Sequence, residues 1–458
     1  MFYGESARGY PNVCRRLLFF RPGDCTSTKS FRQLLDLACG GDATAAEQLQ
    51  SAFVGFTVIR PIPNTPLGRT VVDWYPDDRP NVVPRVVAPC RRYDAHLAGL
   101  RLTVKGLTWQ QQDSAVAACA TVGLWTMFQS SAFQDRIALP TTAGITESGH
   151  RTASFGERVF PTSGLFNHHL LEAIKEHGLA PLFLEGDEKD DFGSSAFSVA
   201  RFASTCASLL RSGFPVLIIG KRGKDGHVIC AVGFRPRTPP RLATGKFEEE
   251  DAQIDHLYIH DDALGANVRF ALRAGEEGHA VLVPDPPDPK RPNPPVESPT
   301  LDVEEFIPRE MAIAVVPELR VSPDMLHEVG LEVAKEMSTE MSGVVRPRKR
   351  RLPGVHVSLR LVRLSTYFES VLAECVAQGR PLQRARLELA EKTPPMSLYL
   401  AVVRISVEGN PMMDVLYDTT DGRRGLEPFA HTVFDADTAW LLRNATWISP
   451  FGKRIRAY

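Results

Sequence analysis

A proline-rich segment constrains the fold of this chain more than any other feature of its sequence. Eight of the eighteen residues from Val283 to Thr300 are proline. Proline has no backbone N–H to donate and favours extended geometry, so this segment can join neither a helix interior nor a central strand. We therefore expect a linker over 283–300. The alternative is a long surface loop within one domain.

The linker separates the regions that we expect in a chain of 458 residues. Residues 1–100 form a mixed N-terminal region, where apolar spacing predicts a helix over 30–53 with a kink at Gly40-Gly41. Residues 101–282 form a central domain, and residues 301–458 form a C-terminal α+β domain. In that last region, hydrophobic patterns predict strands at 311–316, 398–407 and 414–417 and helices at 325–341 and 364–376.

Composition and charge exclude several classes of protein. The chain is 43% hydrophobic and 23% charged, as globular proteins are, and its net charge of −1 creates no global field for nucleic acid. No apolar run approaches the about 18 residues that a membrane helix needs. The run Leu17–Phe20 is too short for a signal peptide. We expect a cytoplasmic protein with no membrane or nucleic-acid partner.

The eight cysteines are widely spread, and no two have CxxC spacing. This pattern indicates neither a disulfide framework nor a thiolate zinc site, so we expect no metal and no cofactor. In a reducing compartment most of the cysteines are free thiols, and Cys206 and Cys230 lie in apolar segments typical of a core. A single catalytic cysteine is the sharper hypothesis, and its position decides which one it is.

The first candidate segment, residues 109–125, reads WQQQDSAVAACATVGLW. A polar glutamine cluster leads into an alanine-rich apolar stretch, which predicts a buried helix with Cys119 near its start. A helix N-terminus carries partial positive charge and free N–H groups, and both favour the thiolate, which is the attacking species. Gln112 could donate its side-chain amide to a developing oxyanion, together with the backbone N–H of Cys119.

Two further segments supply a base and a carboxylate. Apolar strands at 212–220 and 227–234 flank a glycine-containing turn, so His227 opens the second strand at a strand edge, a position suited to a general base. In residues 255–265, Leu257 and Ile259 alternate inward and Asp261 follows on the same side. A carboxylate there could accept the N–H of His227 and orient its ring.

The order of these motifs resembles the papain-like cysteine peptidase superfamily. A helix-capping cysteine, a GFPV…GHVICAVG pair of strands and a DDALG strand end are similar, above all, to its bacterial bacteriocin-processing (double-glycine) branch, over roughly residues 100–282. The resemblance implies a papain-like fold, in which the cysteine-bearing helix packs on an antiparallel sheet. It also implies a catalytic triad of Cys119, His227 and Asp261 in a thiol protease.

The chain departs from the family pattern at three places. The family has its oxyanion glutamine six residues before the cysteine, where this chain has Asp113, with Gln112 one residue earlier. Alanines flank the cysteine where a glycine is common. Asp262 follows Asp261 where a proline is common, so either carboxylate could complete the triad.

Three functions remain open from the sequence. The first is a cysteine peptidase or isopeptidase that acts on a protein or peptide through an acyl-enzyme, with the C-terminal domain recognising a partner. The second is a transglutaminase-like acyltransferase or deamidase that uses the same triad. The third is a catalytically degenerate binding or regulatory module.

Overall fold

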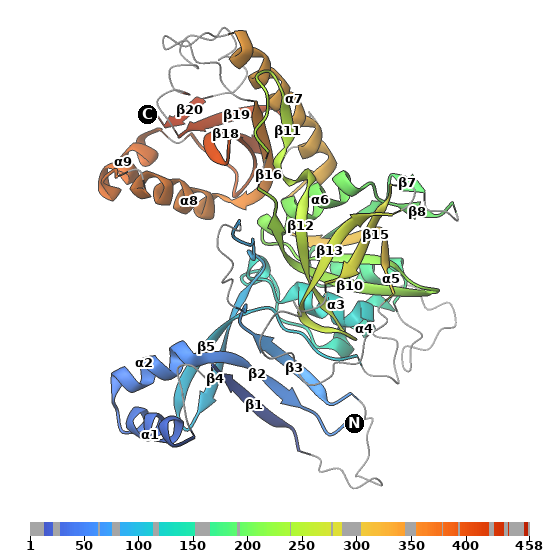
Figure 1. Cartoon of the computed structure of the whole chain (residues 1–458), viewed down its shortest axis with the longest axis vertical. Coiled ribbons are helices and arrows are strands. Elements are labelled where there is room, and N and C mark those ends of the chain that lie inside the picture. Colours follow the sequence, from blue (N-terminus) through green and yellow to red (C-terminus); the bar gives the residue numbers. More distant parts are fainter. Residues whose placement is uncertain are drawn as a thin grey trace.

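The computed structural model describes residues 13–21, 28–62, 65–75, 83–112, 119–151, 165–189, 193–238, 240–275, 278–285, 304–343, 354–377, 379–392, 394–420, 426–434, 438 and 453–456. It contains both helices and sheets in three parts. In Figure 1 the blue N-terminal part lies at the lower left, the orange-red C-terminal part lies at the upper left, and the green and yellow barrel lies at mid-height on the right. Among the described helices, none combines the length and apolar character that a membrane crossing requires.

The N-terminal part has its own apolar core between two helices and two small sheets. Its elements are β1 (Arg15–Phe20), α1 (Thr28–Cys39), α2 (Ala43–Ala52), β2 (Phe53–Ile59), β3 (Leu67–Val72), β4 (Arg91–Leu97) and β5 (Leu100–Gly106). The expected kink at Gly40-Gly41 is a complete break between α1 and α2. Gly41 has φ +96°, a backbone conformation that favours glycine, and Asp42 then caps α2 by accepting the N–H of Ala45.

The central part is built on a closed barrel of six antiparallel strands. Strands pair in the order β14, β13, β12, β10, β9 and β15, and a pairing between β15 and β14 closes the circle, while β6 extends the sheet beside β15. The strands are β6 (Ala180–Glu185), β7 (Glu188–Lys189), β8 (Ser195–Ala196), β9 (Val216–Arg222), β10 (Asp225–Pro236), β12 (Ile254–Asp261), β13 (Gly265–Ala274), β14 (Ala280–Pro284) and β15 (Phe306–Val315). The helices are α3 (Cys119–Phe128), α4 (Thr142–Gly149), α5 (Asn167–Glu176) and α6 (Val199–Arg211), with single 3₁₀ turns at Ser131–Phe133 and Glu250–Ala252.

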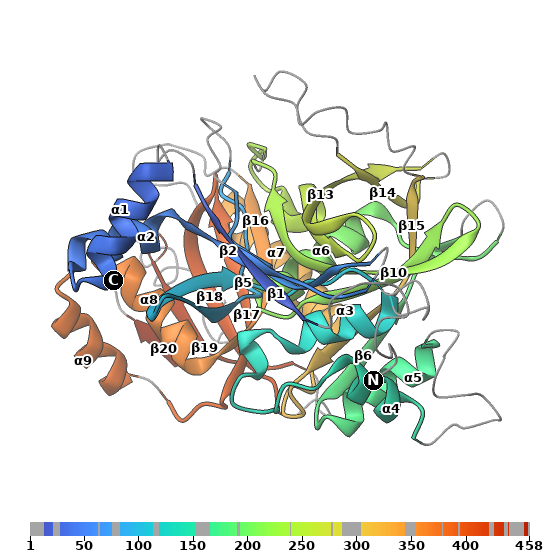
Figure 2. The same cartoon turned by 90° about the horizontal axis from the view of Figure 1, so that it is seen from below.

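Helix α3 packs against the barrel because its residues Ala120 to Phe128 are all buried and apolar or small. It contacts β9, β10 and β12, and Figure 2 shows it beside β10. At the contact, Gly123 approaches Leu217 of β9 so closely that a Cβ there would lie 2.6 Å from the leucine side chain. The predicted cysteine-bearing helix on an antiparallel sheet is therefore present, over the part of the helix that the structure describes.

The C-terminal part is a six-stranded sheet with helices on both faces. Strands pair in the order β11, β16, β17, β18, β19 and β20. They are β11 (Phe247–Glu249), β16 (Val355–Arg363), β17 (Tyr399–Val407), β18 (Asn410–Asp418), β19 (Pro428–Val433) and β20 (Lys453–Arg456), and the helices are α7 (Pro323–Gly343), α8 (Leu364–Ala377) and α9 (Leu382–Lys392). Alternate residues of β16 and β17 face the core under α7, and the others face the core under α8 and α9.

The parts do not divide where the sequence predicted. Residues 286–300 of the proline-rich segment lie outside the described residues, but β14 and β15 on either side of it pair at Leu282 and Phe306. The segment thus connects two strands that pair within one barrel. The expected boundary at residue 300 differs from the structure because β15, placed in the C-terminal domain from sequence, completes the barrel. Conversely, β11 falls within the predicted central domain but pairs with β16 of the C-terminal sheet.

Barrel closure places a phenylalanine over a glycine, and this contact can be tested. A Cβ at Gly220 would lie 2.2 Å from the carbonyl oxygen of Ile307 and 2.8 Å from the ring of Phe306. We expect Gly220→Ala to destabilise the protein by about 1–3 kcal/mol, the usual cost of overpacking. Gly226→Ala, in the same hairpin, is the control because nothing lies within 4 Å of its Cβ position. Equal unfolding free energies of the two variants in denaturant titrations would contradict this account.

Candidate functional site

Cys119 is the first described residue of α3 and is only partly buried. Its thiol is hydrogen-bonded with the imidazole of His227 on β10. The two residues are 108 positions apart in sequence, and the packing of α3 on β10 brings them together. Residues 113–118, which include the predicted start of the helix and Asp113, lie outside the described residues.

His227 follows the tight turn between β9 and β10 and lies opposite Gly220 in the sheet. Its ring is mostly buried, with 14% of the side chain exposed. Nε2 lies 3.3 Å from Oδ2 of Asp261 and 3.6 Å from Oδ1 of Asp262. The edge of the ring also packs against the ring of Phe306, with 6.3 Å between centroids. The carboxylates thus approach Nε2 of His227, and Phe306 packs against its ring.

Asp261 ends β12, and its side chain is fully buried. Besides His227, its Oδ2 accepts a hydrogen bond from the guanidinium of Arg222 at the end of β9. Its Oδ1 accepts the backbone N–H groups of Ala263 and Leu264 at 2.9 and 3.0 Å. Four donors therefore surround this carboxylate, which compensates for its removal from water.

Asp262 is also buried, but its carboxylate lacks the hydrogen-bond donors that surround Asp261. Its side chain is 2% exposed, and neither of its carboxylate oxygens accepts a hydrogen bond from another residue that the structure describes. Its Oδ1 lies 3.6 Å from Nε2 of His227. The two adjacent aspartates, which sequence reasoning left as alternatives, thus both reach the histidine, and only Asp261 has a full set of donors.

These surroundings shift three pKa values. Burial lowers the pKa of His227, but hydrogen bonds to Asp261 and Cys119 and the charges of both carboxylates outweigh burial and raise it to about 9. Burial would raise the pKa of Asp261, but hydrogen bonds from His227 and Arg222 hold it well below its usual range. Burial, reinforced by the charge of Asp261, raises the pKa of Asp262 to about 6.

The shift of His227 has a defined consequence for stability. Its folded-state pKa of about 9 lies above the reference value of 6.5 for the unfolded chain. The stabilisation from this histidine is therefore fully present below pH 6.5 and is lost as the pH rises through about 9. Around neutral pH the site therefore holds an imidazolium beside a buried carboxylate.

The segment before α3 is fixed to the barrel and to the N-terminal part. The indole N–H of Trp109 donates to the backbone carbonyl of Asp261 at 2.7 Å, and Trp109 also forms an isolated bridge with Thr70 of β3. Gln111 is bonded to Leu67 through its backbone N–H at 3.0 Å and through its side-chain oxygen at 3.3 Å. Gln112 follows it and is partly buried, and its role in an oxyanion hole stays a prediction.

Sequence reasoning missed three residues of the site, namely Arg222, Phe306 and Gly220. Arg222 stood in a stretch interpreted only as a turn, and Phe306 was assigned to another domain. The pairing of β9 with β15 brings Phe306 opposite Arg222 and next to Gly220. The one signal in the sequence was an arginine at a strand end two residues from a glycine, which by itself is unspecific.

The same cluster has the donor types of a metal site. Ligand atoms of His227, Asp261 and Asp262 lie within 4.8 Å of one another. However, Arg222 already donates to Asp261, and the raised pKa keeps His227 protonated at neutral pH. A metal ion would have to displace a proton beside a fixed guanidinium, so this arrangement favours proton chemistry over metal binding.

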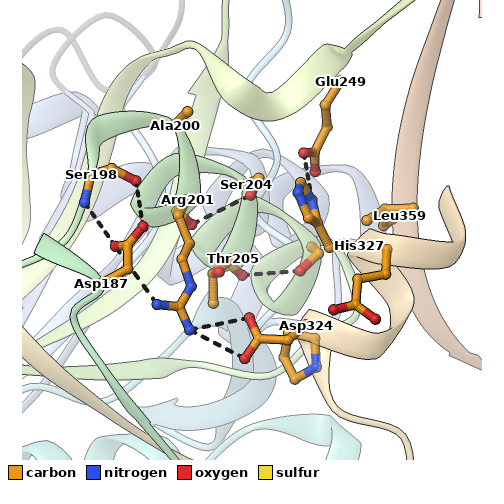
Figure 3. A pocket seen from close by; sticks show the side chains of 13 residues that line it. Asp187, Ser198, Ala200, Arg201, Ser204, Thr205, Glu249, Asp324, His327 and Leu359 are labelled. Atoms are coloured by element: carbon orange, nitrogen blue, oxygen red, sulfur yellow. Dashed lines mark hydrogen bonds and ion pairs between the residues drawn. The ribbon is translucent and has the colours of Figure 1, made fainter. Parts of the chain in front are cut away.

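A separate pocket of about 520 Å³ lies between α6 and α7, and no member of the cluster at His227 lines it. Its charged side chains are largely paired with one another. Figure 3 shows Arg201 between Asp187 and Asp324, at 3.6 and 3.2 Å, and His327 with its Nδ1 2.8 Å from Glu249. The residues that line it include no cysteine. It therefore offers no thiol, and chemistry rather than volume identifies the candidate site.

No protein-family model matches this chain, and no curated protein matches it either.

The raised pKa of His227 is directly measurable. In an NMR titration we expect the imidazole of His227 to titrate near pH 9 and to shift toward the ordinary value of about 6.5 in Asp261→Asn, which lacks the charged partner. Asp255→Asn is the matched control. Asp255 lies on β12, as Asp261 does, but pairs with a different histidine, His256. A wild-type titration close to 6.5 would show that the carboxylates do not act on this ring.

Proposed function

We propose that this protein is a thiol hydrolase of papain-like type that cleaves peptide or isopeptide bonds. The observation that supports it most is a thiol, an imidazole and a buried carboxylate in one hydrogen-bonded series, Cys119–His227–Asp261. A triad is recognised by such geometry and by the role of each group rather than by sequence position. The cysteine-bearing helix packed on an antiparallel sheet is also the arrangement that the resemblance to the papain-like family implies.

The proposed reaction assigns one role to each residue. Nε2 of His227 faces the carboxylates, which leaves Nδ1 to hold the proton that Cys119 gives up, so the reactive state is a thiolate paired with the imidazolium. The thiolate attacks the substrate carbonyl carbon, and a C–S bond forms. The C–N bond then breaks, and the leaving amine takes the proton from His227. Water attacks the acyl-enzyme with His227 as base, the C–S bond breaks, and the thiol is restored.

Two further groups support this chemistry. Asp261 orients the ring and stabilises the imidazolium, consistent with the raised pKa of His227. The backbone N–H of Cys119 and the amide of Gln112 are the proposed oxyanion donors. The protein or peptide substrate and a partner for the C-terminal part are proposals that rest on the reaction alone.

Thiolate formation can be tested without a substrate. With iodoacetamide at pH 6.5, we expect Cys119 to be labelled at least about 10-fold faster than Cys39, an exposed free thiol. His227→Gln should slow labelling by up to about 100-fold, because an ordinary thiol with a pKa near 8.5 is only about 1% thiolate at this pH. His256→Gln is the control, since His256 pairs with carboxylates elsewhere in the barrel. Equal labelling rates of Cys119 and Cys39 would contradict an activated thiolate and would favour a binding module with an inactive site.

The reaction itself is tested with a mixed peptide library and mass spectrometry. We expect products with a new carboxylate, and we expect Cys119→Ala to abolish them with little change in melting temperature, because Cys119 is only partly buried. The same incubation with methylamine separates the reaction types. Methylamide products in place of acids would mean acyl transfer, and cleavage that persists in Cys119→Ala would contradict the assignment of the nucleophile.

A further inference from the structure

Two adjacent buried carboxylates compete for one histidine nitrogen at this site. Asp261 and Asp262 lie 3.3 and 3.6 Å from Nε2 of His227, a difference too small to decide which of them orients the ring. When two carboxylates share a site, their like charges raise one of the two pKa values strongly, and the pair then shares a proton. Some other group must decide which aspartate stays ionised.

Arg222 lies where its charge can keep Asp261 ionised. It lies two residues beyond Gly220, which is the direct partner of His227, so Arg222 and His227 lie on the same face of the β9–β10 ladder. Its side chain is 18% exposed and its guanidinium donates to Oδ2 of Asp261, the oxygen that His227 also faces. Arg222 therefore reaches from β9 past β10 to the end of β12.

Asp262 has no comparable partner. Both of its oxygens lack a hydrogen bond from another described residue, although only 2% of the side chain is exposed. His227 and Arg222 act on both aspartates, and the charge of Asp261 also acts on Asp262. From α3, Cys119 faces His227, and before β15, Glu304 approaches the turn at Gly223. The one permanent cation in this set donates to Asp261.

We propose that Arg222 is a positioning residue that makes Asp261, rather than Asp262, the carboxylate that orients His227. This inference rests on the proposed thiol chemistry. By holding Asp261 ionised, Arg222 keeps the imidazolium paired at acidic pH, where an isolated pair of aspartates would already have taken up a proton. The thiolate of Cys119 then persists to lower pH than the two carboxylates alone would allow.

The test compares iodoacetamide labelling of Cys119 at pH 5.5 and pH 8.0 in the full-length protein. In Arg222→Met, we expect the rate at pH 5.5 to fall about 10-fold while the rate at pH 8.0 changes less than about threefold, because the shared proton raises one carboxyl pKa. Arg222→Lys should retain part of the low-pH rate, since it keeps the charge but loses the planar fork. Lys221→Met removes a cation from the opposite face of β9 and is the matched control.

A double variant separates positioning from a structural role. Asp262→Asn in the Arg222→Met background removes the competing carboxylate, so we expect the low-pH rate to return to within about threefold of wild type. A uniform loss of rate at both pH values, or no rescue by Asp262→Asn, would overturn the proposal.

Two single variants of the aspartates test the proposal even if Arg222→Met does not fold. Among the single variants, Asp261→Asn should lose the low-pH rate and Asp262→Asn should keep it, and the reverse result would assign the orienting role to Asp262. Failure of the proposed function is distinguishable, because wild-type Cys119 would then react no faster than Cys39 at any pH.

Discussion

The burial of the Asp261 carboxylate is the constraint around which the candidate site is assembled. A buried anion is tolerated only when donors replace the water that it loses, and removing one partner of such a pair typically costs about 3–5 kcal/mol. The donors to Asp261 come from β9, β10 and the turn after β12. Satisfying this one carboxylate therefore fixes the relative positions of three strands, and with them the ring of His227.

The rest of the central part holds this arrangement from two sides. On one side, β15 closes the barrel and places the buried ring of Phe306 over Gly220 and against His227. On the other side, the end of β12 contacts the segment that leads to Cys119. The indole N–H of Trp109 donates to the carbonyl of Asp261, and Nε2 of His260 lies 3.1 Å from the carbonyl oxygen of Leu107. The Asp261 carboxylate, His227 and the segment before α3 are thus linked by contacts to backbone as well as between side chains.

The C-terminal part is continuous with the barrel rather than a separate appendage. One apolar core runs from the barrel through α6 and α7 to one face of the C-terminal sheet. The exchange of β11 into that sheet and a 2.7 Å hydrogen bond from the backbone N–H of Leu361 to Ser212 strengthen the connection. Within the sheet, the buried Asp414 is paired with Arg404 and Arg360. The polar pocket between α6 and α7 lies at this junction, so any ligand there would contact both parts.

Local sequence patterns determined the elements and the candidate chemistry. The strands on either side of the turn before His227 and the helices at 325–341 and 364–376 were predictable because side-chain periodicity and turn residues act over a few neighbours. Gly40-Gly41 predicted a kink, whereas the structure has a complete break there. Sequence also singled out Cys119, His227 and Asp261, which the structure brings together. Only the tertiary structure decided that β15 closes the barrel, that Asp262 is buried without a donor and that Arg222 reaches Asp261. Those outcomes depend on strand pairing between distant segments and on the solvation of individual atoms, and neither leaves a pattern in neighbouring residues.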